Sequence, residues 1–367
     1  MEHAKLRTIL TIAAVAALVI VASATAAIIL TTEDESPLDA HDPIHIQYDA
    51  GFIESQGVTG GDGTPSNPYV IEGWRIVLDA SSDVRSAVTL YGTDAHVVIR
   101  DIELLFQGNM TVPSTTGILL EDASNCTIQN VTFVNLWYGV HVMLYSFDLI
   151  VENLQVASNT FRDCSTAVYV DSPGSEHLLW DGDLSISDNR FTGVGMCVNA
   201  GHMSGIDFQD NVVADASEGL VYLRWCRDCT VTGNALNGDG ESAVRITDSS
   251  RIEVSDNSWM FGHTGVRVSG SDNVTVERNN MTSVSVGILV LDSQDVVARF
   301  NQLAPYGWPG EDLVGIWLES SLRVDASNNS IHYYRVGVLV VDCEDCTLLD
   351  NFYSCAIDQI VETTTSP

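Results

Sequence analysis

The chain has 367 residues, and 45% of them are hydrophobic, which is enough for a large core and excludes disorder over most of its length. This length fits one large domain or two to three ordinary ones. The 49 acidic residues against 16 Lys and Arg give a formal net charge of −33. Because that field repels phosphate groups, nucleic acid is excluded as a general partner.

The N-terminus has the pattern of an export segment. Residues 8–32 contain no charged side chain, and they follow Lys5 and Arg7. A basic start before an apolar run is typical of an export signal, and this run is long enough to span a bilayer. We expect residues 1–32 to be a cleaved signal peptide or a hydrophobic helix anchored in the membrane, followed by an acidic linker over 33–42. Both interpretations predict an extracellular or cell-surface location, with membrane contact through residues 8–32 only if the segment is uncleaved.

Residues 43–76 differ in composition from the rest of the chain. They contain the turn-forming run Gly60-Gly61-Asp62-Gly63 and a later Asn67-Pro68. We expect this segment to cap the domain that follows, because an uncovered sheet edge invites aggregation. The glycine run is a poor match to calcium-binding repeats and occurs once, so calcium lacks a specific motif and no cofactor is predicted.

A repeat of about 22 residues dominates the remaining sequence. Apolar-x-apolar triplets recur at steps of 22 to 30 residues, with an earlier mark at Ala87. The residues that precede the triplets are Gly117, Gly139, Ala167, Cys197, Leu220, Ala243, Gly265, Gly287, Gly315 and Gly337. An asparagine lies 14 residues after seven of these marks, at Asn211, Asn234, Asn257, Asn279, Asn301, Asn329 and Asn351. Such a fixed period predicts a stack of similar units.

The length and alternation of the repeat identify the fold. Alternation with period two excludes stacked helix pairs, and about 22 residues are too few for a four-stranded propeller blade. We predict an all-β fold, a right-handed parallel β-helix (solenoid) of about eleven coils over residues 77–357, with a C-terminal tail over 358–367. The asparagines are expected to hydrogen-bond to one another along the stack, because an amide both donates and accepts.

The segment "GVTGGDGTPSNPYVIEGW", residues 57–74, together with these coils resembles the archaeal secreted β-helix proteins. That group lies within the carbohydrate-binding and sugar-hydrolase β-helix proteins, which include NosD-type copper-associated proteins. The resemblance covers roughly residues 43–357. It implies an extracytoplasmic location and a glycan ligand, and it implies no particular reaction.

The middle residue of each triplet is expected to point outward, so these residues form a column on one face of the solenoid. Aromatic rings stack on sugar rings, and arginine forks bind carboxylate or sulfate through two hydrogen bonds. Residues of both kinds cluster here and in the next outward column. The predicted ligand-binding residues are Tyr169, Asn199, Tyr222, Arg224, Arg245, Arg267, Trp317 and Glu319.

The preferred function is binding of an extracellular polysaccharide, acidic in character, on this face. The simpler alternative is that these side chains suit exposed strands and pair with nearby acids, giving a structural surface protein without a ligand. A third interpretation is a lyase or epimerase for uronate-containing glycans, with Arg245 or Arg267 neutralising the carboxylate and Tyr222 or His141 as the base. No catalytic residue is assigned, and a hydrolase is disfavoured because the outward acids lie on distant coils.

Insertions and cysteines complete the sequence evidence. Insertions after Met143 and Val170 are expected to leave from the binding face, and residues 302–314 return to it. Their Trp180, Tyr306 and Trp308 are candidate groove walls, and the alternative is that these loops pack on themselves. Two Cys-x-x-Cys pairs, Cys226/Cys229 and Cys343/Cys346, lie five coils apart, or about 24 Å, which is too far for one zinc ion. They predict buried thiols or local disulfides, and no metal site.

Overall fold

The computed structural model describes residues 38–82, 84–108, 115–145, 151–171, 181–305 and 313–362. The predicted export segment, residues 1–32, lies outside these ranges. Within them, no helix has both the length and the apolar character needed to cross a membrane.

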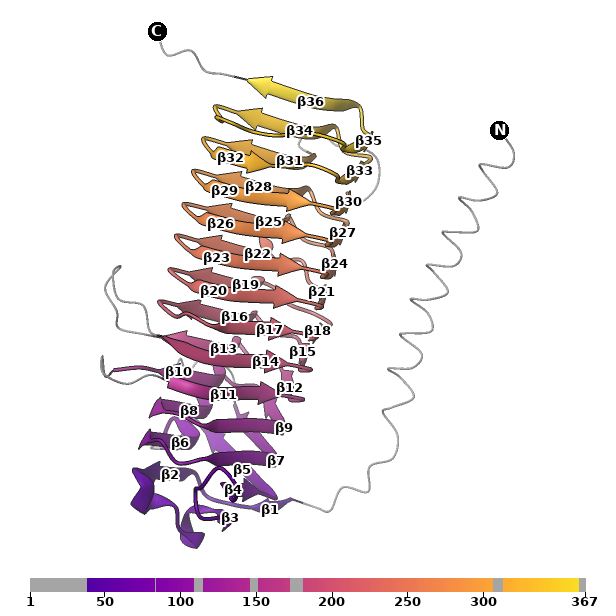
Figure 1. Cartoon of the computed structure of the whole chain (residues 1–367). Helices are drawn as coiled ribbons and strands as arrows, with labels where there is room; N and C mark the ends of the chain where they lie inside the picture. Colours follow the sequence, from indigo (N-terminus) through magenta and orange to yellow (C-terminus); the bar gives the residue numbers. More distant parts are fainter. Residues whose placement is uncertain are drawn as a thin grey trace. The chain divides into compact units, whose positions relative to one another are not determined.

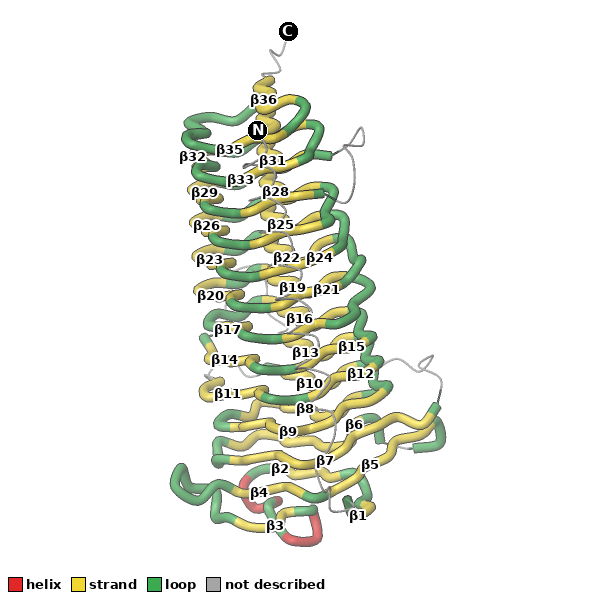
Figure 2. The backbone as a smooth tube through the Cα atoms, turned by 90° about the vertical axis from the view of Figure 1, so that its right-hand side faces the viewer, coloured by secondary structure: helices red, strands yellow, loops and turns green. Residues whose placement is uncertain are grey.

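The described residues form a stack of coils along one axis, with two sheets running through it (Figures 1 and 2). One sheet has thirteen strands, roughly one per coil, and we call it the thirteen-strand sheet. Its strands are β2 (Ile44–Gln47), β6 (Ser86–Thr93), β8 (Thr116–Ala123), β10 (Tyr138–Met143), β13 (Thr166–Asp171), β16 (Met196–Gly201), β19 (Gly219–Arg224), β22 (Ser242–Thr247), β25 (Thr264–Ser269), β28 (Val286–Leu291), β31 (Val314–Glu319), β34 (Val336–Val341) and β36 (Ile357–Glu362).

The second sheet has twenty-three strands, usually two per coil with a corner between them. They are β1 (Asp39–Ala40), β3 (Val58–Gly60), β4 (Tyr69–Glu72), β5 (Trp74–Asp79), β7 (Val97–Gln107), β9 (Cys126–Val134), β11 (Val151–Ala157), β12 (Thr160–Arg162), β14 (Gly182–Ser187), β15 (Arg190–Thr192), β17 (Ile206–Gln209), β18 (Val212–Val213), β20 (Arg227–Thr232), β21 (Ala235–Asn237), β23 (Ser250–Ser255), β24 (Ser258–Met260), β26 (Asp272–Glu277), β27 (Asn280–Thr282), β29 (Gln294–Arg299), β30 (Gln302–Ala304), β32 (Leu322–Asp325), β33 (Ser330–His332) and β35 (Phe352–Ser354). Two short 3-10 turns, Asp49–Gly51 and Glu54–Gln56, belong to the N-terminal segment.

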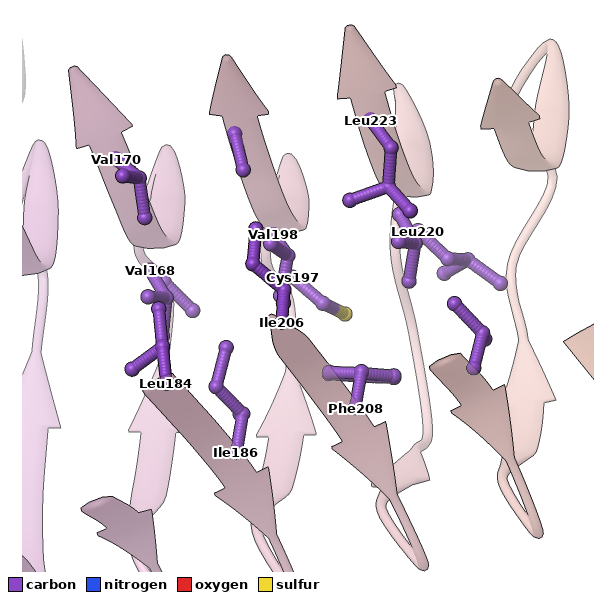
Figure 3. Close-up of a cluster of buried hydrophobic side chains, with 14 of the residues drawn as sticks. Val168, Val170, Leu184, Ile186, Cys197, Val198, Ile206, Phe208, Leu220 and Leu223 are labelled. Carbon is purple, nitrogen blue, oxygen red and sulfur yellow. The ribbon is translucent and has the colours of Figure 1, made fainter. Parts of the chain in front are cut away.

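The strand register confirms the predicted solenoid. Successive coils pair in parallel, so that one inward row holds Val244, Val266, Ile288, Ile316 and Val338 in that order. All five are buried. Figure 3 shows the same kind of packing lower in the stack, where Val168 and Val198 of one sheet face Leu184 and Ile206 of the other. The hydrophobic interior is therefore continuous along the stack.

The ends of the stack differ from the expected boundaries. Strand β1 lies in the segment predicted as an acidic linker and pairs with β5, and β36 lies mostly in the predicted tail and pairs with β34. Strand β2 lies in the predicted cap and adds Ile44 and Ile46 to the core. The sequence repeat is incomplete in these strands, because a strand in an end coil pairs with a neighbouring coil on one side only.

A buried asparagine ladder runs up one corner, as the sequence predicts. From Asn189 onward, each side-chain Oδ1 accepts hydrogen bonds from the backbone N–H and the Nδ2 of the asparagine one coil below, and Asn159 Oδ1 accepts the backbone N–H of Val131. Asn257, for example, accepts both from Asn234, at 3.0 and 2.9 Å, and donates its own Nδ2 to Val231 O at 2.8 Å. The ladder comprises Asn159, Asn189, Asn211, Asn234, Asn257, Asn279, Asn301, Asn329 and Asn351. It satisfies corner amides that would otherwise be buried without partners.

Six of the repeat glycines are required by packing. A Cβ atom at any of them would lie 2.5 or 2.6 Å from a backbone carbonyl oxygen of the next coil. Large side chains of the other sheet, such as Phe133 beside Gly117 and Phe161 beside Gly139, fill the remaining space. The six are Gly117, Gly139, Gly265, Gly287, Gly315 and Gly337.

Candidate functional site

The predicted site residues all lie on the outer face of the thirteen-strand sheet. Its register places six of them in one column, which we call the outer column. In order along the stack they are Tyr169, Asn199, Tyr222, Arg245, Arg267 and, after Leu289, Trp317. Arg224 and Glu319 lie in the neighbouring column on β19 and β31. Trp317 and Glu319 are thus separated from the other six by the coil that carries Leu289.

An aromatic cluster forms the N-terminal side of this face. Tyr138 stacks on Tyr169 with ring centroids 4.7 Å apart and planes inclined by 11°. The His141 ring lies 4.8 Å from Tyr138 and 5.0 Å from Tyr169. His141 is 9% exposed, and its Nε2 contacts no hydrogen-bond partner in the described part of the chain. Burial disfavours the imidazolium and lowers the pKa of His141 to about 4.

A hollow of 300 Å³ lies next to this cluster, and we call it the Gly201 hollow. Tyr169 and Tyr222 border it, with Asn199 between them in the outer column. In the adjacent column Gly201 lies between Asp171 and Arg224, so the missing side chain leaves an opening between an acid and a base. The site combines aromatic surface with both signs of charge.

The Arg224 guanidinium is held by a ring within the same hollow. Its Cζ atom lies 3.5 Å from the centroid of Trp225, which also lines the hollow. Arg224 takes part in none of the ion pairs found within the described ranges. A cation held on an aromatic face without a carboxylate partner remains available to an anionic or hydroxylated ligand.

A second hollow of 110 Å³ lies on the other side of Tyr222, and we call it the Gly219 hollow. Its apolar wall is Met196 and Tyr222, and its polar wall includes Glu218 and Ser242. Ser242 is 5% exposed, and its Oγ meets no hydrogen-bond partner among the residues that the structure describes. Tyr222 therefore separates two hollows that open on the same face.

The glycines that open these hollows differ from the glycines of the core. A Cβ on Gly201 would meet no atom closer than Arg224 O at 3.6 Å, and one on Gly219 none closer than Ser242 O at 3.2 Å. Packing at the six repeat glycines instead forbids any side chain. Gly201 is therefore not required by the fold, and Gly219 is constrained far less than the repeat glycines, yet the absence of both side chains creates the hollows.

The two arginines of the outer column share one acid. Glu241 lies 3.9 Å from Arg245 Nη1 and 3.4 Å from Arg267 Nη1. Arg245 also lies over the ring of Tyr222, with Cζ 5.0 Å from its centroid. These contacts match the simpler alternative, in which surface arginines pair with nearby acids. The positive charge of this pair is consequently reduced, unlike that of Arg224.

Sequence reasoning found the tyrosine and arginine residues of the two hollows but missed two acids of the Gly219 hollow. Glu218 and Glu241 precede the strands β19 and β22, so they lie outside the triplets used to define the columns. The available signal was a glycine at an outward position, as at Gly201, whereas Gly219 shares the row of Ser242, which alternation directs inward. The candidate groove walls Trp180, Tyr306 and Trp308 lie outside the described residues. No cluster of three or more His, Cys, Asp or Glu placed to hold a metal ion occurs in the described ranges.

Comparison with known proteins agrees with the fold. A family model for the right-handed β-helix region matches residues 192–352. The protein is a right-handed parallel β-helix. No curated protein is similar enough in sequence to count as a match.

Among solved structures, this β-helix is similar to a mutant tailspike protein of E. coli bacteriophage HK620 in complex with a hexasaccharide, with a TM-score of 0.50, 15% identity, and coverage of 86% of this chain and 65% of that one. It is also similar to DFA-IIIase from Arthrobacter chlorophenolicus A6 in complex with GF2 (TM-score 0.46, 15% identity, 71% and 70% covered). A mutant of the periplasmic alginate epimerase AlgG has a TM-score of 0.46 at 11% identity, with 78% and 85% covered. At these identities the likeness concerns the fold alone.

Proposed function

We propose that this protein is an exported β-helix that binds an extracellular polysaccharide, acidic in character, on the outer face of the thirteen-strand sheet. The observation that carries the proposal is the Gly201 hollow. Two tyrosines flank its polar lining, which includes Arg224, an arginine that forms no ion pair with a carboxylate among the described residues. Export is proposed from the apolar segment at residues 8–32. The finer resemblance to archaeal and NosD-type proteins remains part of this proposal.

The lining of the Gly201 hollow suits a sugar ring. Pyranose rings present apolar C–H faces, which pack on aromatic rings such as those of Tyr169 and Tyr222. Their hydroxyl groups both donate and accept, so they can bind the Asn199 amide and the Asp171 carboxylate. A sugar ring bound between Asp171 and Arg224 would contact the aromatic rings and the polar groups of the hollow together.

The acidic character of the ligand is inferred from Arg224. A uronate carboxylate or a sulfate would accept two parallel hydrogen bonds from its guanidinium. The net charge of −33 opposes binding of a polyanion at long range, so binding is expected to strengthen as salt screens this repulsion. Arg245 and Arg267 contribute less, because Glu241 already pairs with both.

A lyase or epimerase acting on uronate is the second candidate, and the Tyr222–Arg245 contact is the observation that favours it. A phenol beside a guanidinium places a proton acceptor next to a group that neutralises a carboxylate. An absorbance assay for unsaturated uronate products would detect a lyase, and loss of signal in Tyr222→Phe would assign the base.

Glycan-array binding by the purified protein tests the main proposal. The Gly201→Leu variant fills the hollow and is expected to weaken binding at least about tenfold, while Thr275→Leu on the other sheet leaves it unchanged. Retained binding in Gly201→Leu, or the absence of any glycan binding by the parent protein, overturns the proposal. Unchanged binding in the double variant Arg245→Ala plus Arg267→Ala would restrict the site to the Gly201 hollow.

A further inference from the structure

A second hydrogen-bonded ladder, made of serines, runs along the corners that follow strands β22, β25, β28 and β31 of the thirteen-strand sheet. Its members are Ser249, Ser271, Ser293 and Ser321, and all are buried. Each hydroxyl donates to the carbonyl oxygen two residues earlier and accepts the backbone N–H of the residue one coil below. Ser271 Oγ, for example, donates to Ser269 O at 2.9 Å and accepts Ser249 N–H at 3.1 Å.

Cysteines take the place of serine at both ends of this ladder. Cys226 donates its backbone N–H to Ser249 Oγ at 3.0 Å, and Glu344, which follows Cys343, donates its N–H to Ser321 O. The Cys226 and Cys343 thiols each lie 3.4 Å from the carbonyl oxygen two residues earlier, where the serines place their hydroxyl groups. Both cysteines are therefore ladder positions, occupied by sulfur in place of oxygen.

The residue three positions after each ladder serine belongs to the twenty-three-strand sheet and points into the core. Behind the serines this position is always a branched aliphatic residue, namely Ile252, Val274, Val296 or Val324. Behind Cys226 and Cys343 it is Cys229 and Cys346. In both coils that have a cysteine at the ladder position, the inward residue three positions later is also a cysteine. A core-filling role alone gives no reason for this pairing.

Cys126 provides an internal comparison. It occupies the same inward row, in register with Val97, but the corner position before it is Ala123. Cys126 is buried and has no cysteine across its corner. The inward position thus accepts a single thiol as filler, and the paired cysteines need a further explanation.

The two thiols of each pair flank one corner of a coil and influence each other's pKa. The neighbouring thiol lowers the pKa of Cys226 and raises that of Cys229, and Cys343 contributes to the raised pKa of Cys346. Residues at i and i+3 across a tight corner are close enough for a disulfide when both side chains point to the same side. Cys226 and Cys229 are buried in the core, and Cys343 and Cys346 are partly buried against it.

We propose that Cys226–Cys229 and Cys343–Cys346 form two disulfide bonds that close the corners at the two ends of the serine ladder. A thiolate of each pair attacks the disulfide of an exchange partner, such as oxidised glutathione, and forms a mixed disulfide. The second thiol displaces the partner sulfur, so each protein pair loses two protons and two electrons and the partner is reduced to two thiols. Cys126, Cys164, Cys197 and Cys355 stay as thiols.

The accessible pair is expected to oxidise first. Cys343 and Cys346 are partly exposed, whereas Cys226 and Cys229 are buried and require local opening of the corner. Closing a short loop constrains the unfolded chain modestly, and oxidation is expected to raise Tm by a few degrees.

Peptide mapping tests the proposal directly. The full chain is incubated with oxidised glutathione, alkylated in denaturant and digested. Trypsin cleaves after Arg224 and Arg227, so residues 225–227 and 228–245 stay joined only through Cys226–Cys229. A protease specific for Glu cuts after Glu344 and reports the second pair in the same way. We expect both joined pairs and four alkylated cysteines. Eight alkylated cysteines, or cross-links that involve Cys126, overturn the proposal.

A matched variant separates the disulfide from the packing. In Cys226→Ser plus Cys229→Ile, the corner acquires the residues of the next coil, Ser249 and Ile252. This variant is expected to fold and to lose the dependence of its Tm on reductant that derives from the first pair. The proposal is contradicted if reductant changes the Tm of the parent and of a variant with both corners replaced in this way by the same amount. This test does not depend on whether the protein binds a glycan.

Discussion

The coils from β13 to β25 and the coils from β28 to β34 share one backbone plan but have different outer faces. In the first group the outer column carries Tyr169, Asn199, Tyr222, Arg245 and Arg267, and glycines open two hollows beside it. In the second group it reads Leu289, Trp317 and Leu339. The difference teaches that the inward rows and corners fix the fold, while the outer face is free to vary and to acquire a binding site.

The asparagine ladder continues through both groups, whereas the serine ladder covers only the last two coils of the first group and the first two of the second. The asparagine ladder passes from Asn159 to Asn351, and the serine ladder bridges the two groups from Ser249 to Ser321. In a solenoid each coil contacts only its neighbours, so stability is roughly a sum of local terms. Substitutions in these ladders should therefore act alike in both groups, and substitutions on the outer face should not.

The largest effect is expected from the asparagine ladder. Asn257→Ala removes the acceptor for two buried N–H groups of Asn234, and each unsatisfied group costs about 1–3 kcal/mol. We expect the free energy of unfolding to fall by about 3–4 kcal/mol, measured by urea denaturation with circular dichroism. Asn301→Ala, in the second group, should cost the same. A clear inequality between the two variants would contradict a uniform ladder.

The next effect is a pH dependence from the coil before the first group, where His141 lies on β10. The folded-state pKa of His141, about 4, lies below its unfolded value near 6.5, so the unfolded chain binds more protons between these values. The free energy of unfolding therefore contains the full contribution of neutral His141 above pH 6.5. It falls by up to about 3 kcal/mol as the pH drops to 4. Urea denaturation across this range measures it.

The control for this pH dependence is His141→Phe, which keeps a ring between Tyr138 and Tyr169 but cannot titrate. The other acids of the protein titrate equally in both proteins, so the difference between the two curves isolates His141. Identical curves would show that the imidazole is protonated as readily in the folded protein as in the unfolded chain.

Alanine should lower the stability of the fold at a repeat glycine and leave it nearly unchanged at Gly201. Gly287→Ala places Cβ 2.5 Å from Gly315 O and is expected to destabilise the fold by about 1–3 kcal/mol. Gly201→Ala has 3.6 Å of room and should change stability by less than about 0.5 kcal/mol. Thermal unfolding of the two variants checks this. Comparable losses of Tm would mean that Gly201 also serves packing.

The smallest effect concerns ligand affinity. Tyr222→Ala removes the ring shared by both hollows and is expected to weaken glycan binding about tenfold, which corresponds to about 1.4 kcal/mol. Leu289→Ala, at the same column position in the second group, should bind as the parent does. Titration calorimetry with the glycan selected on the array compares them, and an equal loss in both would extend the site along the whole face.

The sequence was sufficient to predict the coils because their period is recorded repeatedly. Asparagines such as Asn279 and Asn301 recur at a constant offset, and each must fit the corner formed by its neighbours. The outer column followed from the same register, since alternation fixes the direction of residues such as Arg245 and Arg267. The end strands β1, β2 and β36 were harder to place, because pairing on one side only leaves a weaker pattern.

The hollows were decided by tertiary structure alone. Strict alternation would direct Ser242 inward with Val244, yet Ser242 lines the outer Gly219 hollow. Glu241 likewise meets Arg267 from the next coil, a contact across 26 residues of chain. A repeat determines which residues share a row, since every coil obeys the same backbone geometry. Which cavities and ion pairs arise between rows depends on side-chain size and corner shape, and these are properties of neighbouring coils together.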